Sequence, residues 1–145
     1  MKSTQETDKL LGTKNLKDLN QYLTGDYMNP YDSLEDYLNK YIAEHQLVLA
    51  DIVKDSQLNK NYAYQILNGQ KANPHRDKII PICLAMHMTL EETNRALKIS
   101  KSGTLYSKDK RDSIIILCIN NKVFDVMKVN DFLYENGFEA LGGSI

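Results

Sequence analysis

Apolar residues recur every three or four positions through most of this chain, and this spacing constrains its fold more than any other feature. A period of about 3.6 residues belongs to an amphipathic helix, whereas a half-buried strand alternates with a period of two. Seven segments have the helical spacing, beginning near Leu34, Val48, Asn59, Pro74, Leu90, Arg111 and Asp125. Because no alternating segment competes with them, the sequence predicts an all-α fold.

Capping residues mark several helix ends. Ser33 and Asn59 each precede a helical pattern and are expected to cap it, while Gly69 should end the second of these helices. Thr89 followed by Glu92 predicts a capping box. The side chains expected to face the core are Leu34, Tyr37, Leu38, Tyr41, Ile42, Leu49, Ile52, Val53, Leu58, Tyr62, Ala63, Ile66, Leu67, Ile79, Ile82, Cys83, Met86, Ala96, Leu97, Ile99, Ile114, Ile115, Leu117, Cys118, Val126, Val129, Phe132 and Leu133.

The helix that follows Gly69 carries two prolines. Asn73 is expected to cap it and Pro74 to be its first residue, where a missing N–H costs little. Pro81 falls inside the same pattern. A proline there should kink or shorten the helix unless the fold accommodates it.

The sequence repeats itself weakly. RDKIIPIC at residues 76–83 matches RDSIIILC at residues 111–118, at an offset of 35. At an offset of 36, Leu90, Asn94 and Leu97 match Val126, Asn130 and Leu133. The pattern indicates a helical hairpin used twice, although two amphipathic hairpins can also match by chance.

Composition limits the class of protein. With 145 residues, 42% of them hydrophobic and 26% charged, the chain is expected to form one compact domain. The net charge of −1 gives no overall attraction to nucleic acid or to a membrane, so charge has to be considered locally. Cys83 and Cys118 lie in apolar runs and are expected to be reduced core residues, which favours the cytoplasm. MKSTQETDKL has no apolar signal core, and no run approaches the ~20 residues of a membrane span.

Residues 49–68 have the spacing of a helix-turn-helix, in which two short helices are joined by a turn of about three residues. Ile52 and Val53 would line the inner face of the first helix, and Leu58 would fill the turn. Ala63 matters most because its small side chain lets the two helices approach each other.

The outer face of the second helix is polar and has no carboxylate. Asn and Gln can pair with adenine, Lys with guanine or phosphate, and Tyr with phosphate or a thymine methyl group. The predicted base contacts are Lys60, Asn61, Tyr64, Gln65 and Asn68. Neither Glu nor Asp occurs between Gln57 and Ala72, as expected of a surface that meets the phosphate backbone. The predicted phosphate contacts are Asn59, Lys71, Asn73, Arg76 and Lys78, partly through N–H groups that follow Asn73.

The stretch DIVKDSQLNKNYAYQILNGQKANPHRDKII resembles the lambda-repressor-like, or XRE, family of helix-turn-helix transcriptional regulators. The resemblance covers about residues 34–100 and implies a five-helix DNA-binding domain whose recognition helix, about residues 59–68, enters the major groove. Three positions depart from the family pattern. Gln57 replaces a frequent Gly and would need a left-handed backbone, Leu49 replaces a phosphate-clamping Gln, and Val53 replaces Ala.

These patterns predict three regions: an N-terminal arm, partly helical, at residues 1–33, the helix-turn-helix domain at 34–100, and a C-terminal helical hairpin packed on it at 101–145. The hairpin looks like the extension of a bacterial subgroup of the family. Because one module reads few bases, we expect a homodimer on double-stranded DNA, joined through the hairpin or the tyrosine-rich arm.

The expected function is therefore sequence-specific transcription regulation, and the alternative is a protein-interaction adaptor built on the same scaffold. No nucleophile elbow, phosphate loop or acid–base pair suggests an enzyme. No cofactor or metal is expected either, because His45, His75 and His87 have no ligand spacing and fit surface or packing roles.

Overall fold

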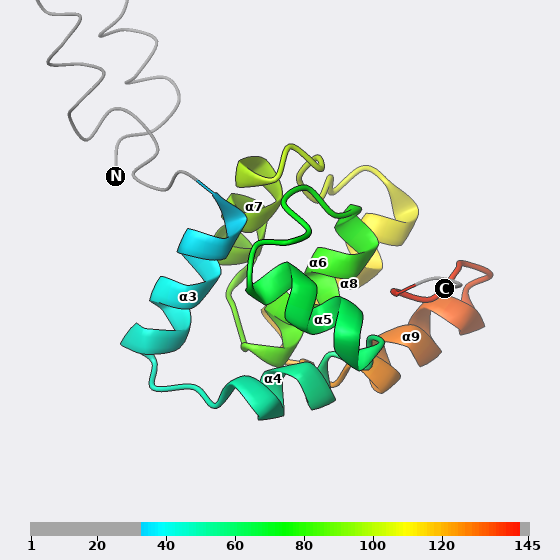
Figure 1. Cartoon of the computed structure of the whole chain (residues 1–145). Helices are drawn as coiled ribbons and strands as arrows, with labels where there is room; N and C mark the ends of the chain where they lie inside the picture. Colours follow the sequence, from blue (N-terminus) through cyan, green and yellow to red (C-terminus); the bar gives the residue numbers. More distant parts are fainter. Residues whose placement is uncertain (1–32, 143–145) are drawn as a thin grey trace, which may run out of the picture. The chain divides into compact units, whose positions relative to one another are not determined.

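The computed structural model describes residues 33–142, in which every regular element is a helix (Figure 1). The all-α prediction is therefore confirmed for this part of the chain, and the predicted N-terminal arm lies outside it up to residue 32. The described residues, 33–142, belong to one compact unit. The helices are α3 (Leu34–Glu44), α4 (Leu49–Asp55), α5 (Lys60–Leu67), α6 (Arg76–Ala85), α7 (Leu90–Ile99), α8 (Lys110–Asn120) and α9 (Val126–Glu135). None of these seven is both long and apolar enough to cross a bilayer.

Most helix starts follow the capping signals. The Ser33 hydroxyl accepts a hydrogen bond from the amide of Asp36 at 3.1 Å, which confirms the cap of α3. Thr89 and Glu92 form the predicted capping box at the start of α7. Such caps satisfy N–H groups that have no partner within the helix.

The predicted start of α6 was wrong. Its cap is His75, whose Nδ1 accepts from the Asp77 amide, and its first residue is Arg76. Asn73 and Pro74 precede the helix, whose first backbone hydrogen bonds run from the amides of Lys78 and Ile79 to the carbonyl of His75, while the carbonyl of Pro74 accepts from the Ser102 hydroxyl.

Pro81 lies inside α6, yet the helix continues to Ala85. A residue with an N–H at this position would donate to the carbonyl of Asp77, and proline cannot. The amide of Gly142 donates to that carbonyl instead, at 2.9 Å. The C-terminal segment thus supplies the bond that Pro81 removes, and the proline is accommodated.

The core lies around α6 and α7. Helix α4 packs on α6 and α3 packs on α7, while α9 also contacts α6 and α8 contacts α7. The hydroxyl of Tyr37 in α3 donates to the carbonyl of Glu92 in α7 at 2.9 Å. Side chains that are almost completely buried include Leu38, Ile66, Ile79, Ile80, Ile82, Leu84, Met88, Leu97, Ile115 and Leu133.

Three residues predicted to face the core lie at the surface instead. Leu49, Phe132 and Leu117 are 39%, 45% and 62% exposed. Leu49 begins the short helix α4. Leu117 lies on α8 and Phe132 lies on α9, where the described chain provides no covering helix. Amphipathic spacing identified the apolar face of these helices, but a face is buried only where another element packs against it.

The repeat found in the sequence is also a repeat of structure. Asn94 Oδ1 accepts from the Leu105 amide at 2.9 Å, and Asn130 Oδ1 accepts from the Leu141 amide at 2.7 Å. The helix ends match as well, because His87 and Lys122 have left-handed φ values of 57° and 58°. The α6–α7 and α8–α9 hairpins therefore use the same local bonds at equivalent positions, which is more than a chance match of amphipathic patterns provides.

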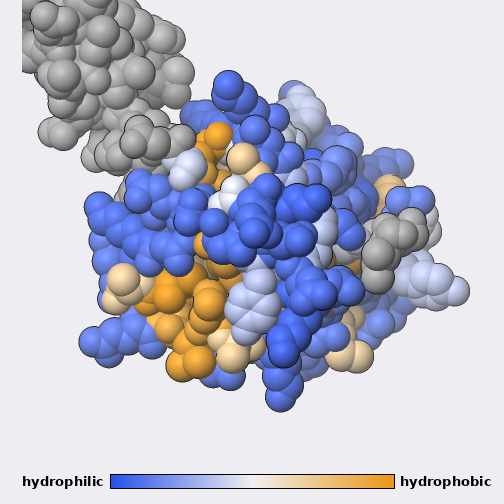
Figure 2. Space-filling view, viewed as in Figure 1, coloured by the Kyte–Doolittle hydropathy of each residue, from blue (hydrophilic) through white to orange (hydrophobic). Residues whose placement is uncertain are grey.

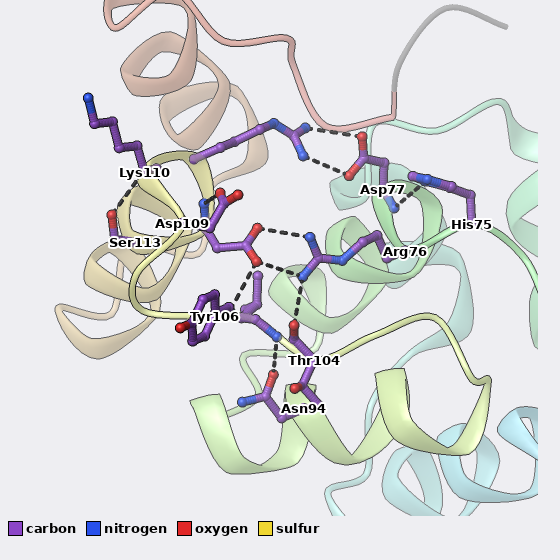
Figure 3. A network of polar contacts seen from close by, with 12 residues as sticks. His75, Arg76, Asp77, Asn94, Thr104, Tyr106, Asp109, Lys110 and Ser113 are labelled. Carbon is purple, nitrogen blue, oxygen red and sulfur yellow. Dashed lines mark hydrogen bonds and ion pairs between the residues drawn. The ribbon is translucent and has the colours of Figure 1, made fainter.

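Two reciprocal ion pairs join the hairpins. Arg76 of α6 binds Asp112 of α8, and Arg111 of α8 binds Asp77 of α6, each through two hydrogen bonds of 2.9 to 3.1 Å. In the sequence repeat, Arg76 corresponds to Arg111 and Asp77 corresponds to Asp112. Each arginine thus binds the aspartate of the other hairpin, so an approximate two-fold relation interchanges the two hairpins. Figure 3 shows this network, in which Arg76 also donates to the carbonyl of Thr104.

Candidate nucleic-acid interface

Helices α4 and α5 are joined by the short turn at residues 56–59. The buried Ser56 hydroxyl donates to the carbonyl of Val53 at 2.7 Å and accepts from the Leu58 amide at 3.3 Å, so it holds the turn from inside. Gln57 has φ 61°, which confirms the predicted left-handed residue. The turn thus keeps two short helices close together without a glycine.

The inner side of the pair is the predicted one. Ile52 and Val53 of α4 are buried, as are Ala63, Ile66 and Leu67 of α5. Ala63 has no exposed surface, in agreement with its expected place at the contact between helices. The Asn59 side chain accepts from the Tyr62 amide at 3.1 Å and caps α5. Aliphatic packing and the cap together fix which side of α5 faces outward.

The outer side of α5 brings the predicted base contacts together. Lys60, Asn61 and Asn68 are exposed, whereas Tyr64 and Gln65 are half-buried. Helical spacing divides them into one row of Lys60, Tyr64 and Asn68 and a second row of Asn61 and Gln65. Figure 2 shows mainly hydrophilic side chains over α5 and, beside it, an apolar patch near α4, where Val48 and Leu49 are exposed.

The far end of α5 faces a hollow that the sequence did not reveal. Tyr64 and Asn68 line it together with Glu35, Asn39 and Leu49, which come from α3 and α4. The Asn39 amide donates to the carbonyl of Leu67 at 2.9 Å and so fixes the end of α5 to α3.

This hollow also brings in a carboxylate. The Glu35 side chain lies so close to Gly69 that a Cβ at that glycine would clash with it. Gly69 also has φ 86°, as expected of the residue that ends α5. The chain is free of acidic residues between Gln57 and Ala72, but the space around α5 is not. Only the packing of α3 against α5 reveals this, and no spacing in the sequence indicates it.

Two of the predicted phosphate contacts lie near one aromatic ring. The Nζ atoms of Lys71 and Lys78 lie 5.7 and 5.4 Å from the ring centre of Tyr62. Tyr62 was expected to face inward and is half-buried. Lys71 is exposed, whereas the amine of Lys78 also donates to the carbonyl of Gly142. Lys71 is thus the more available cation, and the C-terminal segment holds Lys78.

The remaining predicted phosphate contacts are arranged differently from the expectation. Asn73 is exposed. Of the amides that follow it, Pro74 has no N–H and the Asp77 amide donates to His75, and a phosphate contact at this helix start stays a prediction. Both terminal nitrogens of Arg76 donate hydrogen bonds within the protein, to the Asp112 carboxylate and to the carbonyl of Thr104. In this structure Arg76 joins two hairpins, and its contact with phosphate stays a prediction.

The two cysteines are core residues in this structure, as the sequence predicted. Both are buried, and neither forms a disulfide. Burial raises the pKa of the Cys83 thiol to about 12 and also raises the pKa of Cys118. A raised thiol pKa leaves little reactive thiolate near neutral pH, so the cysteines add no nucleophile to the interface.

Comparison of the chain with protein-family models, with curated proteins and with solved structures gave no match.

Proposed function

We propose that this protein is a sequence-specific DNA-binding transcription regulator. In this proposal α3 to α7 are a lambda-repressor-like five-helix domain, and α5 enters the major groove as the recognition helix. The observation that carries the proposal is the outer side of α5, where Lys60, Asn61 and Asn68 are exposed above a buried aliphatic underside. Helices held in this way present several side chains to base edges at once.

The two rows on α5 have different chemistry. Asn61 and Gln65 carry amides that can each make two hydrogen bonds to adenine. Lys60 begins the other row and suits guanine or phosphate, while Tyr64 suits a thymine methyl group or phosphate. We assign base reading first to the amide row, because both of its members carry amides and they lie one turn apart on one side of the helix.

Phosphate binding would depend mainly on Lys71. It is exposed beside Tyr62, close to the end of α5, and it has no acidic partner in the structure described here. Lys78 would bind phosphate as well, once its amine releases the carbonyl of Gly142 and donates to a phosphate oxygen instead. These two contacts position the protein and carry no sequence information.

A protein-interaction adaptor is the competing function, and two observations favour it. Val48 and Leu49 are exposed next to α5, and Glu35 adds a negative charge near Tyr64 and Asn68. Both features suit a protein partner better than a polyanion.

The binding of random-sequence duplex to the full chain, measured against salt concentration, separates the two functions. A DNA binder loses affinity steeply as salt rises, because phosphate contacts release counterions. We expect this loss, and we expect Lys71→Ala to lower the salt slope by about one. No measurable binding at low salt would instead support the adaptor.

Base reading is tested after selection of preferred sites from a random pool. Gln65→Ala should cost about 1 to 3 kcal/mol on the selected site and relax the preference at one position. Asn120→Ala, at an exposed amide of α8, is the matched control and should leave binding unchanged. Equal losses for the two variants would contradict base reading by α5.

A further inference from the structure

An apolar hollow lies between α8 and α9. Seven residues line it, and none of them is charged: Ile114, Leu117, Cys118, Asn121, Val123, Phe132 and Asn136. Leu117 is 62% exposed and Phe132 is 45% exposed. Of the seven large apolar side chains exposed in the described chain, four belong to these two helices: Leu117, Met127, Phe132 and Tyr134. Apolar exposure is therefore concentrated on this hairpin.

The first hairpin shows what the same face looks like when it is covered. The repeat aligns the seven lining residues with Ile79, Ile82, Cys83, Met86, Met88, Ala96 and Ser100. Every one of these is at most 3% exposed. There, α4 packs on α6 and α3 packs on α7. Within residues 33–142 no helix takes the corresponding place on α8 and α9, so this face lacks the cover that its counterpart has.

We propose that a second copy of this chain covers the face, through a two-fold interface formed by α8 and α9. A two-fold axis brings the same patch of each copy together, so a surface must be complementary to itself. This one exposes apolar surface of Leu117 and Phe132, which line the hollow, and its uncharged lining lets it meet its own copy without burying an unpaired charge.

Charges on α9 fit the same arrangement. Lys128, Phe132 and Glu135 are exposed at a spacing of four and then three residues, so they lie on one side of the helix. Two α9 helices that cross antiparallel at a two-fold axis near Phe132 place Lys128 opposite Glu135 of the second copy. The opposite charges thus flank the apolar centre and favour this pairing over a parallel one.

This interface goes beyond the proposed function and does not depend on it. The face belongs to α8 and α9, whereas the proposed DNA contacts belong to α5 and the residues that follow it. Self-association can be measured without DNA, so the dimer and DNA binding can each fail alone.

Sedimentation equilibrium of the full chain over a range of concentrations tests the proposal. We expect a reversible dimer, and we expect Leu117→Lys to raise its dissociation constant by about 30-fold or more, because the substitution places charge at the centre of an apolar contact. Tyr106→Lys is the matched control, since Tyr106 is 58% exposed but does not line the hollow. A wild-type chain that stays monomeric would overturn the proposal, and so would a dimer that Leu117→Lys leaves equally tight.

A charge exchange gives a second readout that does not alter the apolar face. Lys128→Glu and Glu135→Lys should each weaken the dimer, because each puts like charges opposite one another across the axis. The double variant should restore it. Two weak single variants with no recovery in the double variant would contradict the antiparallel arrangement of α9.

Discussion

The α6–α7 and α8–α9 hairpins share a sequence pattern and a set of hydrogen bonds, but they differ in what covers them. Helix α6 buries six consecutive residues from Ile79 to Leu84. Helix α8 buries only Asp112, Ile115, Cys118 and Ile119 and leaves Leu117 exposed. The difference shows that a repeated local structure can serve as core in one place and as surface in another. The surroundings decide this, and the hairpin itself does not.

The largest expected difference concerns equivalent aliphatic residues. Ile82→Ala empties a site with no exposed surface and should lower the free energy of unfolding by about 2 to 5 kcal/mol. Leu117→Ala changes an exposed side chain and should stay within about 0.5 kcal/mol. Urea denaturation at a protein concentration low enough to keep the chain monomeric measures both. Similar losses at the two positions would mean that the faces are equally buried.

The reciprocal ion pairs should differ less. The Asp112 side chain is 6% exposed and accepts from Arg76 and from the Tyr106 amide, whereas that of Asp77 is 17% exposed. Asp112→Asn should therefore cost about 2 to 3 kcal/mol and Asp77→Asn about 1 kcal/mol. Both variants leave an arginine without its counter-charge, but Asp112 is the more buried carboxylate and also accepts from the Tyr106 amide. Denaturation at pH 7 measures both losses. A larger loss for Asp77→Asn would contradict the expectation that the more buried ion pair contributes more to stability.

The asparagines at the hairpin ends should behave alike. Asn94 and Asn130 each accept from one backbone amide at equivalent positions. Replacing either by Ala should cost about 1 kcal/mol, because it leaves a partly buried N–H without its acceptor. Equal losses in denaturation would support one structural unit used twice. A loss at only one of the two would show that the shared hydrogen bond matters in one hairpin alone.

Thiol chemistry gives the smallest expected contrast. The pKa of Cys83 is raised to about 12, so the thiol remains protonated until the pH approaches that value, and ionisation then opposes burial. Folded protein should therefore resist alkylation at pH 8, and stability should fall as the pH rises above the ordinary thiol pKa of about 9. Cys118 lines the hollow and should be alkylated faster than Cys83. Mass spectrometry after timed alkylation measures both rates. Faster modification of Cys83 would contradict the deeper burial of this residue relative to Cys118.

Local features were predictable from the sequence because they depend on neighbours along the chain. The caps at Ser33 and Asn59 and the buried underside of α5 follow from spacing and side-chain chemistry. The left-handed Gln57 was implied by the family resemblance, in which glycine is frequent at this position of the turn. The repeat was also visible in the sequence, and the structure adds equivalent hydrogen bonds of Asn94 and Asn130 to it.

Features that depend on tertiary contacts could not be predicted in this way. Arg76 was expected at phosphate because basic residues cluster near it, yet Asp112, far along the chain, binds it. Gly142 replaces the bond that Pro81 removes, and Glu35 approaches the end of α5. Spacing also does not tell whether Leu117 and Phe132 are covered, since their helices are amphipathic in either case.

We propose that the outer side of α5 binds DNA and that the open face of α8 and α9 binds a second copy. Mapping backbone amide chemical shifts while random-sequence duplex is added at low salt tests this division most directly. The largest changes should fall on residues 59–68 and on Lys71, with the amides of residues 114–123 unchanged. Shifts confined to α8 and α9, or none on α5, would contradict DNA binding by the outer side of α5.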